Sequence, residues 1–268
     1  MPKVRSGQVE LEVVRRGVGM PVLLVHGFPL DHSMWLTQIE LLSSRWQVIA
    51  PDLRGFGGSQ ALSGTATMEQ MADDLDAMLR ALEVDQPVVL CGLSMGGYVG
   101  FQFWRKHRAR LRALVLCDTR AIADTPEGAA GRLKLAETVL RDGTGSLADA
   151  MLPKLFAPAT IEREKEMVES QRRKILAASR EGVAAALRGM AARPSATDYL
   201  PQISLPTLVL VGSEDVISTP DEMRGIAAAI PGSEFVVIPH SGHMTPLENP
   251  AAFDTAIQRF LARVESGS

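Results

Sequence analysis

Gly92-Leu93-Ser94-Met95-Gly96 is the most informative stretch of this chain. It follows the apolar run Pro87–Cys91 and precedes a helical pattern over Gly97–His107. A serine with glycines two residues before and after it, between a strand and a helix, is typical of a turn that exposes a nucleophilic hydroxyl. Such a turn strains the serine backbone, and glycine fits where strand and helix approach closely. The alternative is a glycine-rich turn with an ordinary serine, and we interpret Ser94 as a nucleophile.

Short apolar, β-branched runs alternate with helical patterns along most of the chain. The expected strands are Leu11–Val14, Val22–Val25, Gln47–Ala50, Val88–Leu90, Ala113–Leu116, Thr207–Val211 and Phe235–Ile238. The expected helices are Met34–Leu42, Met68–Leu82 with Thr67 as N-cap, Gly97–His107, Glu222–Ala229 and Pro250–Val264. Continuous apolar strands suit a mostly parallel sheet that helices cover on both faces. The repeated strand-then-helix order therefore predicts a doubly wound α/β fold.

One region interrupts this alternation. Residues 122–200 contain no convincing strand, but they show amphipathic helical patterns over Arg132–Arg141, Ile161–Ser179 and Glu181–Ala192. We interpret residues 122–200 as a helical cap, or lid, inserted into a core domain of residues 1–121 and 201–268, because lids commonly cover sites on such scaffolds. The alternative is an independent helical linker domain.

The composition of the chain limits the kinds of binding partner that we expect. The chain has 268 residues, of which 46% are hydrophobic and 22% charged, with a formal net charge of −3. This balance gives no reason to expect nucleic acid or an anionic membrane as a partner. The N-terminus lacks the apolar segment of a secretory signal, so we expect a cytoplasmic protein. Cys91 and Cys117 are interpreted as buried free thiols, although spacing leaves a disulfide open. The sequence also leaves open whether the protein forms a homo-oligomer.

A nucleophilic serine needs a base that takes its proton, and that base is normally histidine. Among five histidines, His243 follows the last predicted strand, in a loop that can reach the carboxyl edge of the sheet where Ser94 emerges. His240 is the rival, three residues earlier. We prefer His243 because it stands further beyond the end of the strand.

The base in turn needs a carboxylate that orients it. Asp215 and Glu214 follow the predicted strand Thr207–Val211, while Asp118 ends the preceding strand and Asp124 lies a little beyond it. We prefer Asp215, because the chain order serine, aspartate, histidine is typical of one class of triad. The alternative for Asp215 is a turn or helix-capping residue.

The oxyanion that forms during attack needs preorganised donors. The backbone N–H of Met95, directly after the nucleophile, is one candidate. The other is the N–H of Phe28, since Gly27 lets its loop bend close to the site and Pro29 has no N–H. His26 is expected to support this loop rather than to take part in the chemistry.

The sequence contains no convincing motif for binding a cofactor or a metal. Asp52–Ser59 is rich in glycine, but the third glycine of a dinucleotide-binding pattern would fall at Gln60. A structural loop beside the active site is the better interpretation. The sequence has no Walker A, EF-hand or zinc-protease pattern. We therefore expect no cofactor and no bound metal.

Together these motifs resemble the α/β-hydrolase superfamily. The stretches that carry the resemblance are His26–Pro29, Asp52–Ser59, Gly92–Gly97, Gly212–Asp215 and Gly242–His243. Within that superfamily the chain is similar to the bacterial branch of 3-oxoadipate enol-lactonases, carboxylesterases and cofactor-free haloperoxidases. The resemblance implies a Ser-Asp-His triad, an eight-stranded sheet and a helical cap. A serine at the elbow argues against the dehalogenases and epoxide hydrolases of this fold, which use aspartate.

The expected function is a serine hydrolase that cleaves a small carboxylic ester or lactone through an acyl-enzyme. The alternatives are a perhydrolase or haloperoxidase, an acyltransferase, and a low-turnover binding protein of the same fold. The lid residues Met151, Leu152 and Phe156 are candidates for lining the acyl pocket. Arg120 and the cap arginines could hold a substrate carboxylate, but a solvated surface role is the preferred interpretation for them.

Overall fold

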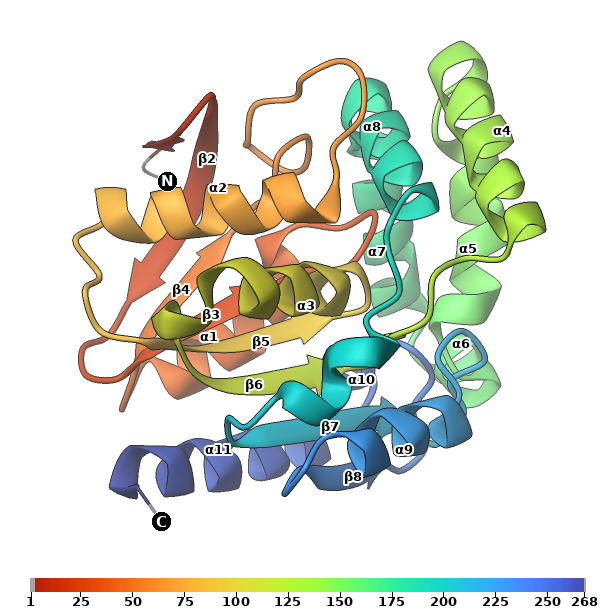
Figure 1. The fold of residues 1–268 in the computed structure, drawn as a ribbon. Coiled ribbons are helices and arrows are strands. Elements are labelled where there is room, and N and C mark those ends of the chain that lie inside the picture. Colours follow the sequence, from red (N-terminus) through yellow and green to blue (C-terminus); the bar gives the residue numbers. More distant parts are fainter. Residues whose placement is uncertain (1–2, 268) are drawn as a thin grey trace.

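The computed structural model describes residues 3–267 (Figure 1). They form an eight-stranded sheet in the order β1-β2-β4-β3-β5-β6-β7-β8. The strands are β1 Lys3–Ser6, β2 Val9–Arg16, β3 Pro21–Val25, β4 Gln47–Pro51, β5 Val88–Leu93, β6 Leu111–Cys117, β7 Thr207–Gly212 and β8 Glu234–Ile238. Strand β2 is antiparallel to both β1 and β4, and the remaining pairs are parallel. The predicted doubly wound α/β fold is confirmed.

Every strand expected from the sequence lies inside an observed strand. The structure also contains β1, a strand that the sequence analysis did not predict. Its residues alternate between charged and small side chains, and its two charged residues are exposed at the edge of the sheet. Only its antiparallel pairing with β2 makes this segment a strand, so a search for apolar runs does not find it.

Helices cover both faces of the sheet. Figure 1 shows α2 (Met68–Ala81) and α3 (Met95–His107) side by side in front of the strands, with α9 (Pro220–Ala229) beside β7. On the opposite face α1 (Leu36–Leu42) contacts α11 (Pro250–Ser266). The buried central strands β3 and β5 therefore pack against helices on two sides, as their continuous apolar sequences predict.

Thr67 begins α2 as the sequence predicts. Its hydroxyl accepts a hydrogen bond from Gln70 N at 3.1 Å, and the Gln70 side chain accepts one from Thr67 N at 3.0 Å. This reciprocal capping box satisfies two N–H groups that have no partner inside the helix.

Helices follow one another between β6 and β7 and lie beyond the carboxyl ends of the strands (Figure 1). They are α4 Pro126–Asp142, α5 Gly145–Leu155, α6 Pro158–Arg163, α7 Lys165–Ala177, α8 Arg180–Ala191 and the 3₁₀ helix η3 Thr197–Gln202. Helix α5 is absent from the helical patterns expected for this region, because Pro153 interrupts its local pattern, whereas the helix continues to Leu155. The sequence analysis also joined α6 and α7, which separate at Glu164, where φ is −106° and ψ is 46°.

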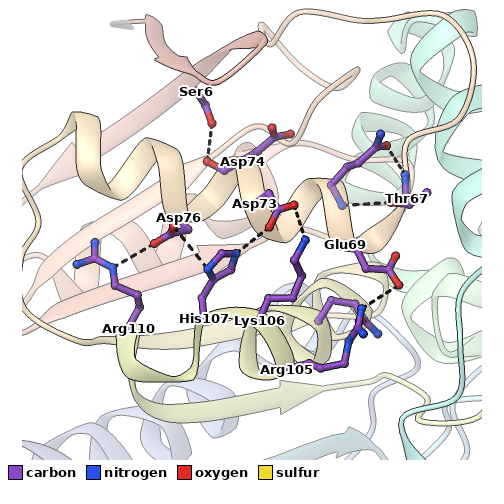
Figure 2. Close-up of polar contacts among 12 residues, drawn as sticks. Ser6, Thr67, Glu69, Asp73, Asp74, Asp76, Arg105, Lys106, His107 and Arg110 are labelled. Atoms are coloured by element: carbon purple, nitrogen blue, oxygen red, sulfur yellow. Dashed lines mark hydrogen bonds and ion pairs between the residues drawn. The ribbon is translucent and has the colours of Figure 1, made fainter.

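Charged side chains lock α3 against α2 (Figure 2). The imidazole of His107, the last residue of α3, lies 2.8 Å from an Asp73 oxygen and 3.5 Å from an Asp76 oxygen. The guanidinium of Arg110 lies 3.3 Å from the other oxygen of Asp76, whose carboxylate is buried. Because α3 begins at the elbow serine, this network fixes the far end of the helix that presents Ser94.

Two further expectations concern cysteine and membranes. Cys91 and Cys117 are buried free thiols, as predicted, with their sulfur atoms 3.7 Å apart on neighbouring strands. Among residues 3–267, no helix has the combination of length and apolar character that crossing a membrane requires.

Candidate active site

Ser94 lies at the sharp turn between β5 and α3. Its backbone has φ of 55° and ψ of −112°, a left-handed conformation that a residue with a side chain rarely adopts. The turn is held by its own backbone groups. Ser94 N donates to Cys117 O at 2.9 Å on strand β6, and Thr119 Oγ1 donates to Ser94 O at 2.7 Å. The structure thus stores strain at the residue that the sequence singled out.

The glycines around Ser94 are required by close backbone contacts. A Cβ atom on Gly92 would lie 2.3 Å from Gly96 O, and one on Gly96 would lie 2.3 Å from Val25 O. A Cβ on Gly97 would lie 2.4 Å from the Thr119 hydroxyl. Any side chain at these positions would push the turn apart, which is the physical reason for the pattern in the sequence.

His243 and Asp215 form a buried hydrogen-bonded pair. Nδ1 of His243 lies 2.8 Å from Oδ2 of Asp215, and the two side chains are 2% and 0% exposed. The other oxygen of Asp215 accepts from Ile217 N at 2.7 Å and Ser218 N at 3.0 Å. The carboxylate is therefore held by its own loop, and as the acceptor of the Nδ1 proton it leaves Nε2 of His243 free to accept one.

The rival residues occupy other positions. His240 and Glu214 are exposed. Asp118 is buried with its oxygens bound to Gly212 N at 2.9 Å and to the Thr245 hydroxyl at 2.5 Å. Burial and the nearby charge of Asp215 raise the pKa of Asp118 well above its usual value. The geometry therefore pairs Asp215, rather than Asp118, with the imidazole of His243.

Two backbone N–H groups near Ser94 have no acceptor among residues 3–267. They belong to Phe28 and Met95. The loop of Phe28 lies beside the elbow, since a Cβ on Gly27 would lie 3.4 Å from the Cβ of Ser94. Met95 is also the first residue of α3, so its N–H lies at the helix N-terminus, where the helix dipole favours negative charge.

His26 supports this loop from below, as the sequence analysis expects. Its Nε2 accepts a hydrogen bond from Leu53 N at 2.9 Å, so its Nδ1 carries the proton and donates to Gly27 O at 3.0 Å. Complete burial lowers the pKa of His26, which keeps the imidazole neutral. Both ring nitrogens are occupied by the backbone, so His26 has no free nitrogen for proton transfer.

A second buried histidine pair was not found from the sequence. His32 Nδ1 lies 2.7 Å from Oδ1 of Asp52, and the same oxygen accepts His32 N at 2.8 Å. The other Asp52 oxygen accepts Gly58 N at 2.9 Å, inside the glycine-rich loop. The only signal in the sequence was the position of Asp52 directly after a strand. This pair makes Asp52–Ser59 a structural loop that supports the site.

The structure also contains two clusters of potential metal ligands. Within residues 3–267 these are Asp31, His32 and Asp52, and Asp118, Asp215 and His243. In each cluster the histidine Nδ1 is already hydrogen bonded to a carboxylate of the same cluster. Each cluster therefore contains a histidine–carboxylate hydrogen bond that occupies Nδ1 of the histidine.

The arginines considered for substrate binding have protein partners. Arg120 lies 2.6 Å from Glu222, on α9. Arg132 and Arg193 both pair with Asp124, at 2.5 and 2.8 Å. Their charges are used in joining segments of the protein, which favours the structural interpretation of these side chains.

The strained serine, the buried histidine–aspartate pair and the two unpartnered N–H groups all lie in segments that follow parallel strands of the doubly wound sheet. A serine at a strand-to-helix elbow is typical of the hydrolases of this fold. The chain belongs to the α/β hydrolase fold family, whose model matches residues 20–250. It is an enzyme of that family.

Proteins similar to this chain include an esterase and enol-lactonases. A thermophilic esterase from Thermogutta terrifontis, solved with malate bound, is 50% identical over 98% of both chains, with a TM-score of 0.96. The enol-lactonase from Burkholderia xenovorans LB400 is 30% identical over 97% of this chain and 100% of that chain, with a TM-score of 0.91. The 3-oxoadipate enol-lactonase 2 of Acinetobacter baylyi is 29% identical over 86% of this chain and 84% of its own length.

Proposed function

We propose that this enzyme hydrolyses small carboxylic esters or lactones through an acyl-enzyme on Ser94. The observation that carries the proposal is the strained backbone of Ser94, which begins α3 at φ of 55°. The 2.8 Å hydrogen bond between His243 and Asp215 and the free N–H groups beside the turn support it. The similarity to an esterase and to enol-lactonases supports the same reaction class.

The first half of the reaction forms the acyl-enzyme. The Oγ of Ser94 attacks the carbonyl carbon while its proton passes to Nε2 of His243. The electron pair of the broken π bond moves to the carbonyl oxygen, which the N–H groups of Phe28 and Met95 stabilise. Within residues 3–267 the Oγ of Ser94 has no hydrogen-bond partner, so it has to approach His243 when substrate binds. Asp215 stabilises the imidazolium that results.

The second half releases the product. The tetrahedral intermediate expels the alkoxide, which takes the proton from Nε2 of His243. Water then loses a proton to the same nitrogen and attacks the acyl carbon, and Ser94 leaves with that proton. An ester gives an alcohol and an acid, whereas a lactone opens to a single hydroxy acid.

We further propose that residues 122–200 act as the lid of this site. The last turn of α5 borders the histidine loop, because Leu155 O accepts the N–H of His243 at 2.9 Å. Leu152, three residues before Leu155, and Phe156, directly after it, are both buried. These side chains, with Met151, are the proposed apolar wall for the acyl group.

The test is release of p-nitrophenol from acetate, butyrate and octanoate esters by purified wild type and variants. Ser94→Ala and His243→Ala should each lower kcat/KM by about 10³-fold or more, because each removes half of one proton-transfer unit. The double variant should be little worse than either single variant. Equal turnover by wild type and Ser94→Ala, or independent additive losses, would refute the assignment.

A second arm of the experiment identifies the acceptor and the substrate class. Lactones of several ring sizes are assayed with the same variants, and products are analysed with and without an added alcohol. The proposal is supported if the acyl group is still transferred to water when an alcohol is present. Preferential transfer of the acyl group to the alcohol would make the enzyme an acyltransferase.

A further inference from the structure

The loop that holds His243 is attached to the lid through its backbone. Leu155 O, at the end of α5, accepts hydrogen bonds from His243 N at 2.9 Å and from Met244 N at 3.2 Å. The position of the imidazole therefore depends on contacts that come from a segment almost ninety residues earlier in the chain. These contacts involve only main-chain atoms of the candidate base.

Glu248 reinforces this junction with both of its carboxylate oxygens. It is the last residue of the short helix α10 (Thr245–Glu248). Oε1 accepts from Gly242 N at 2.9 Å and from Met244 N at 3.1 Å, the two N–H groups that flank His243. Oε2 accepts from Ala157 N at 2.8 Å and from the Thr160 hydroxyl at 2.8 Å. One carboxylate thus binds the histidine loop on one side and the lid on the other.

Gly242 allows these segments to approach. A Cβ at this position would lie 2.7 Å from Ala157 N and 3.2 Å from Oε1 of Glu248. A side chain would therefore separate the loop from the lid and from the carboxylate. The glycine and Glu248 act together, because the first permits the contact that the second makes.

We propose that Glu248 is a positioning residue, which fixes His243 by clamping residues 242–244 to the lid segment 155–160. The inference rests on the proposed function, since it assigns Glu248 a role in the activity of His243. Glu248 acts through the backbone and touches neither Ser94 nor Asp215. A catalytic group that is displaced by about 1 Å can lose about 10²-fold in rate, so a loosened loop should slow turnover without weakening substrate binding.

Three substitutions at Glu248 separate the contacts. Glu248→Ala removes all four hydrogen bonds. Glu248→Asp keeps the charge but is one methylene shorter, so it cannot reach both sides. Glu248→Gln keeps one oxygen, which can accept from Gly242 N and Met244 N, while its amide nitrogen faces the lid. Thr160→Val is the matched control, because it removes a single lid contact and leaves the histidine loop untouched.

The expected result is a loss of kcat that follows the contacts to the histidine loop. Glu248→Ala should lower kcat about 100-fold and Glu248→Asp at least tenfold, with KM within about threefold of wild type. Glu248→Gln should recover kcat to within about fivefold, and Thr160→Val should match wild type. Each variant is assayed well below its own unfolding midpoint, so that lost stability is not read as lost turnover.

The position of the imidazole is measured directly by proton NMR. The downfield resonance of the His243 Nδ1 proton is assigned by its absence in His243→Ala. It should shift or broaden in Glu248→Ala and Glu248→Asp and stay in place in Thr160→Val. This readout does not require turnover, and a side chain that only adds stability would leave the resonance unchanged in a folded variant.

Folded Glu248→Asp with wild-type kcat and an unchanged resonance would overturn the inference. So would a loss of kcat in Thr160→Val as large as that in Glu248→Ala, because the lid contact alone would then account for the effect. If Glu248→Ala does not fold, the aspartate and glutamine variants decide the question. If Ser94→Ala retains full activity, the proposed function fails, and the resonance still decides whether Glu248 positions His243.

Discussion

Two histidines near the loop of Phe28 show how the surroundings of a side chain shift its pKa. His26 and His32 are six residues apart, yet their surroundings move their pKa values in opposite directions. Burial lowers the pKa of His26, whose nitrogens meet only backbone groups. The hydrogen bond to Asp52 raises the pKa of His32. The residue type alone predicts neither direction, because each depends on which partner the fold provides.

The pair of His32 and Asp52 gives a pH-dependent prediction. Because the folded pKa of His32 lies above the unfolded value of 6.5, its extra stability is present below pH 6.5 and is lost as pH rises through the folded pKa. His32→Gln keeps a neutral N–H donor at every pH. We therefore expect this substitution to cost more free energy of unfolding at pH 5.5 than at pH 9.

The measurement is urea unfolding of wild type and His32→Gln at both pH values. The difference in the free energy of unfolding between the two proteins is compared across pH, which cancels titrations that they share. A difference that is constant, or that grows toward pH 9, would contradict a raised pKa of His32 in the folded state.

At the scale of elements, helix α8 packs on the loop of residues 55–66 through backbone contacts. A Cβ on Gly182 would lie 1.9 Å from Gly55 O, and one on Gly189 would lie 1.8 Å from Ala66 O. Between these positions Ala66 N donates to Ala185 O at 3.0 Å. Small residues on one side of α8 thus let the helix lie directly against a loop of the sheet domain.

Two glycine-to-alanine substitutions test this packing. Gly189→Ala should destabilise the protein by about 1–3 kcal/mol, because the added methyl overlaps a carbonyl that is held by its own chain. Gly131→Ala is the matched control on the exposed helix α4, where a Cβ would meet nothing within 4 Å. It should stabilise by about 0.5–1 kcal/mol through helix propensity.

Thermal or urea unfolding of the two variants beside wild type measures both effects. Equal changes in the two variants would mean that α8 does not approach the loop closely. A loss in Gly189→Ala with a gain in Gly131→Ala would support the observed packing of α8.

At the scale of the whole molecule, burial is concentrated in the centre of the sheet. Every residue of β3 and β5 is buried, whereas β8 forms an edge and most of its side chains are half-buried. Amides that open only through global unfolding exchange most slowly. We expect the slowest hydrogen exchange in β3 and β5 and faster exchange in β8, as measured by mass spectrometry on peptides. Slower exchange in β8 than in β5 would contradict this order.

The elements that the sequence predicts well are those whose own residues carry the signal. The central strands are continuous apolar runs, and Thr67 and Gln70 form a capping box within one turn of chain. Predictions fail where the signal lies elsewhere. Strand β1 exists because β2 pairs with it, and α5 passes through a proline that a local pattern reads as a stop.

The same division holds for the candidate site. Ser94, with its glycines, is recognisable because the turn demands those residue types within five positions. Chain order favoured His243 and Asp215, but His240 and Asp118 stayed open until the structure placed one carboxylate 2.8 Å from one imidazole. Glu248 had no signal at all, since its hydrogen bonds join segments far apart in sequence.

The fold class, the strained turn and the order of the candidate residues are therefore readable from the amino-acid sequence, because they depend on local backbone geometry and on the alternation of apolar runs. Folding brings Asp215 to His243, moves the pKa values of His26 and His32 in opposite directions, and lets Glu248 join the histidine loop to residues 157 and 160. Those properties depend on distances between distant segments and on the burial of charge, and neither quantity exists until the chain has folded.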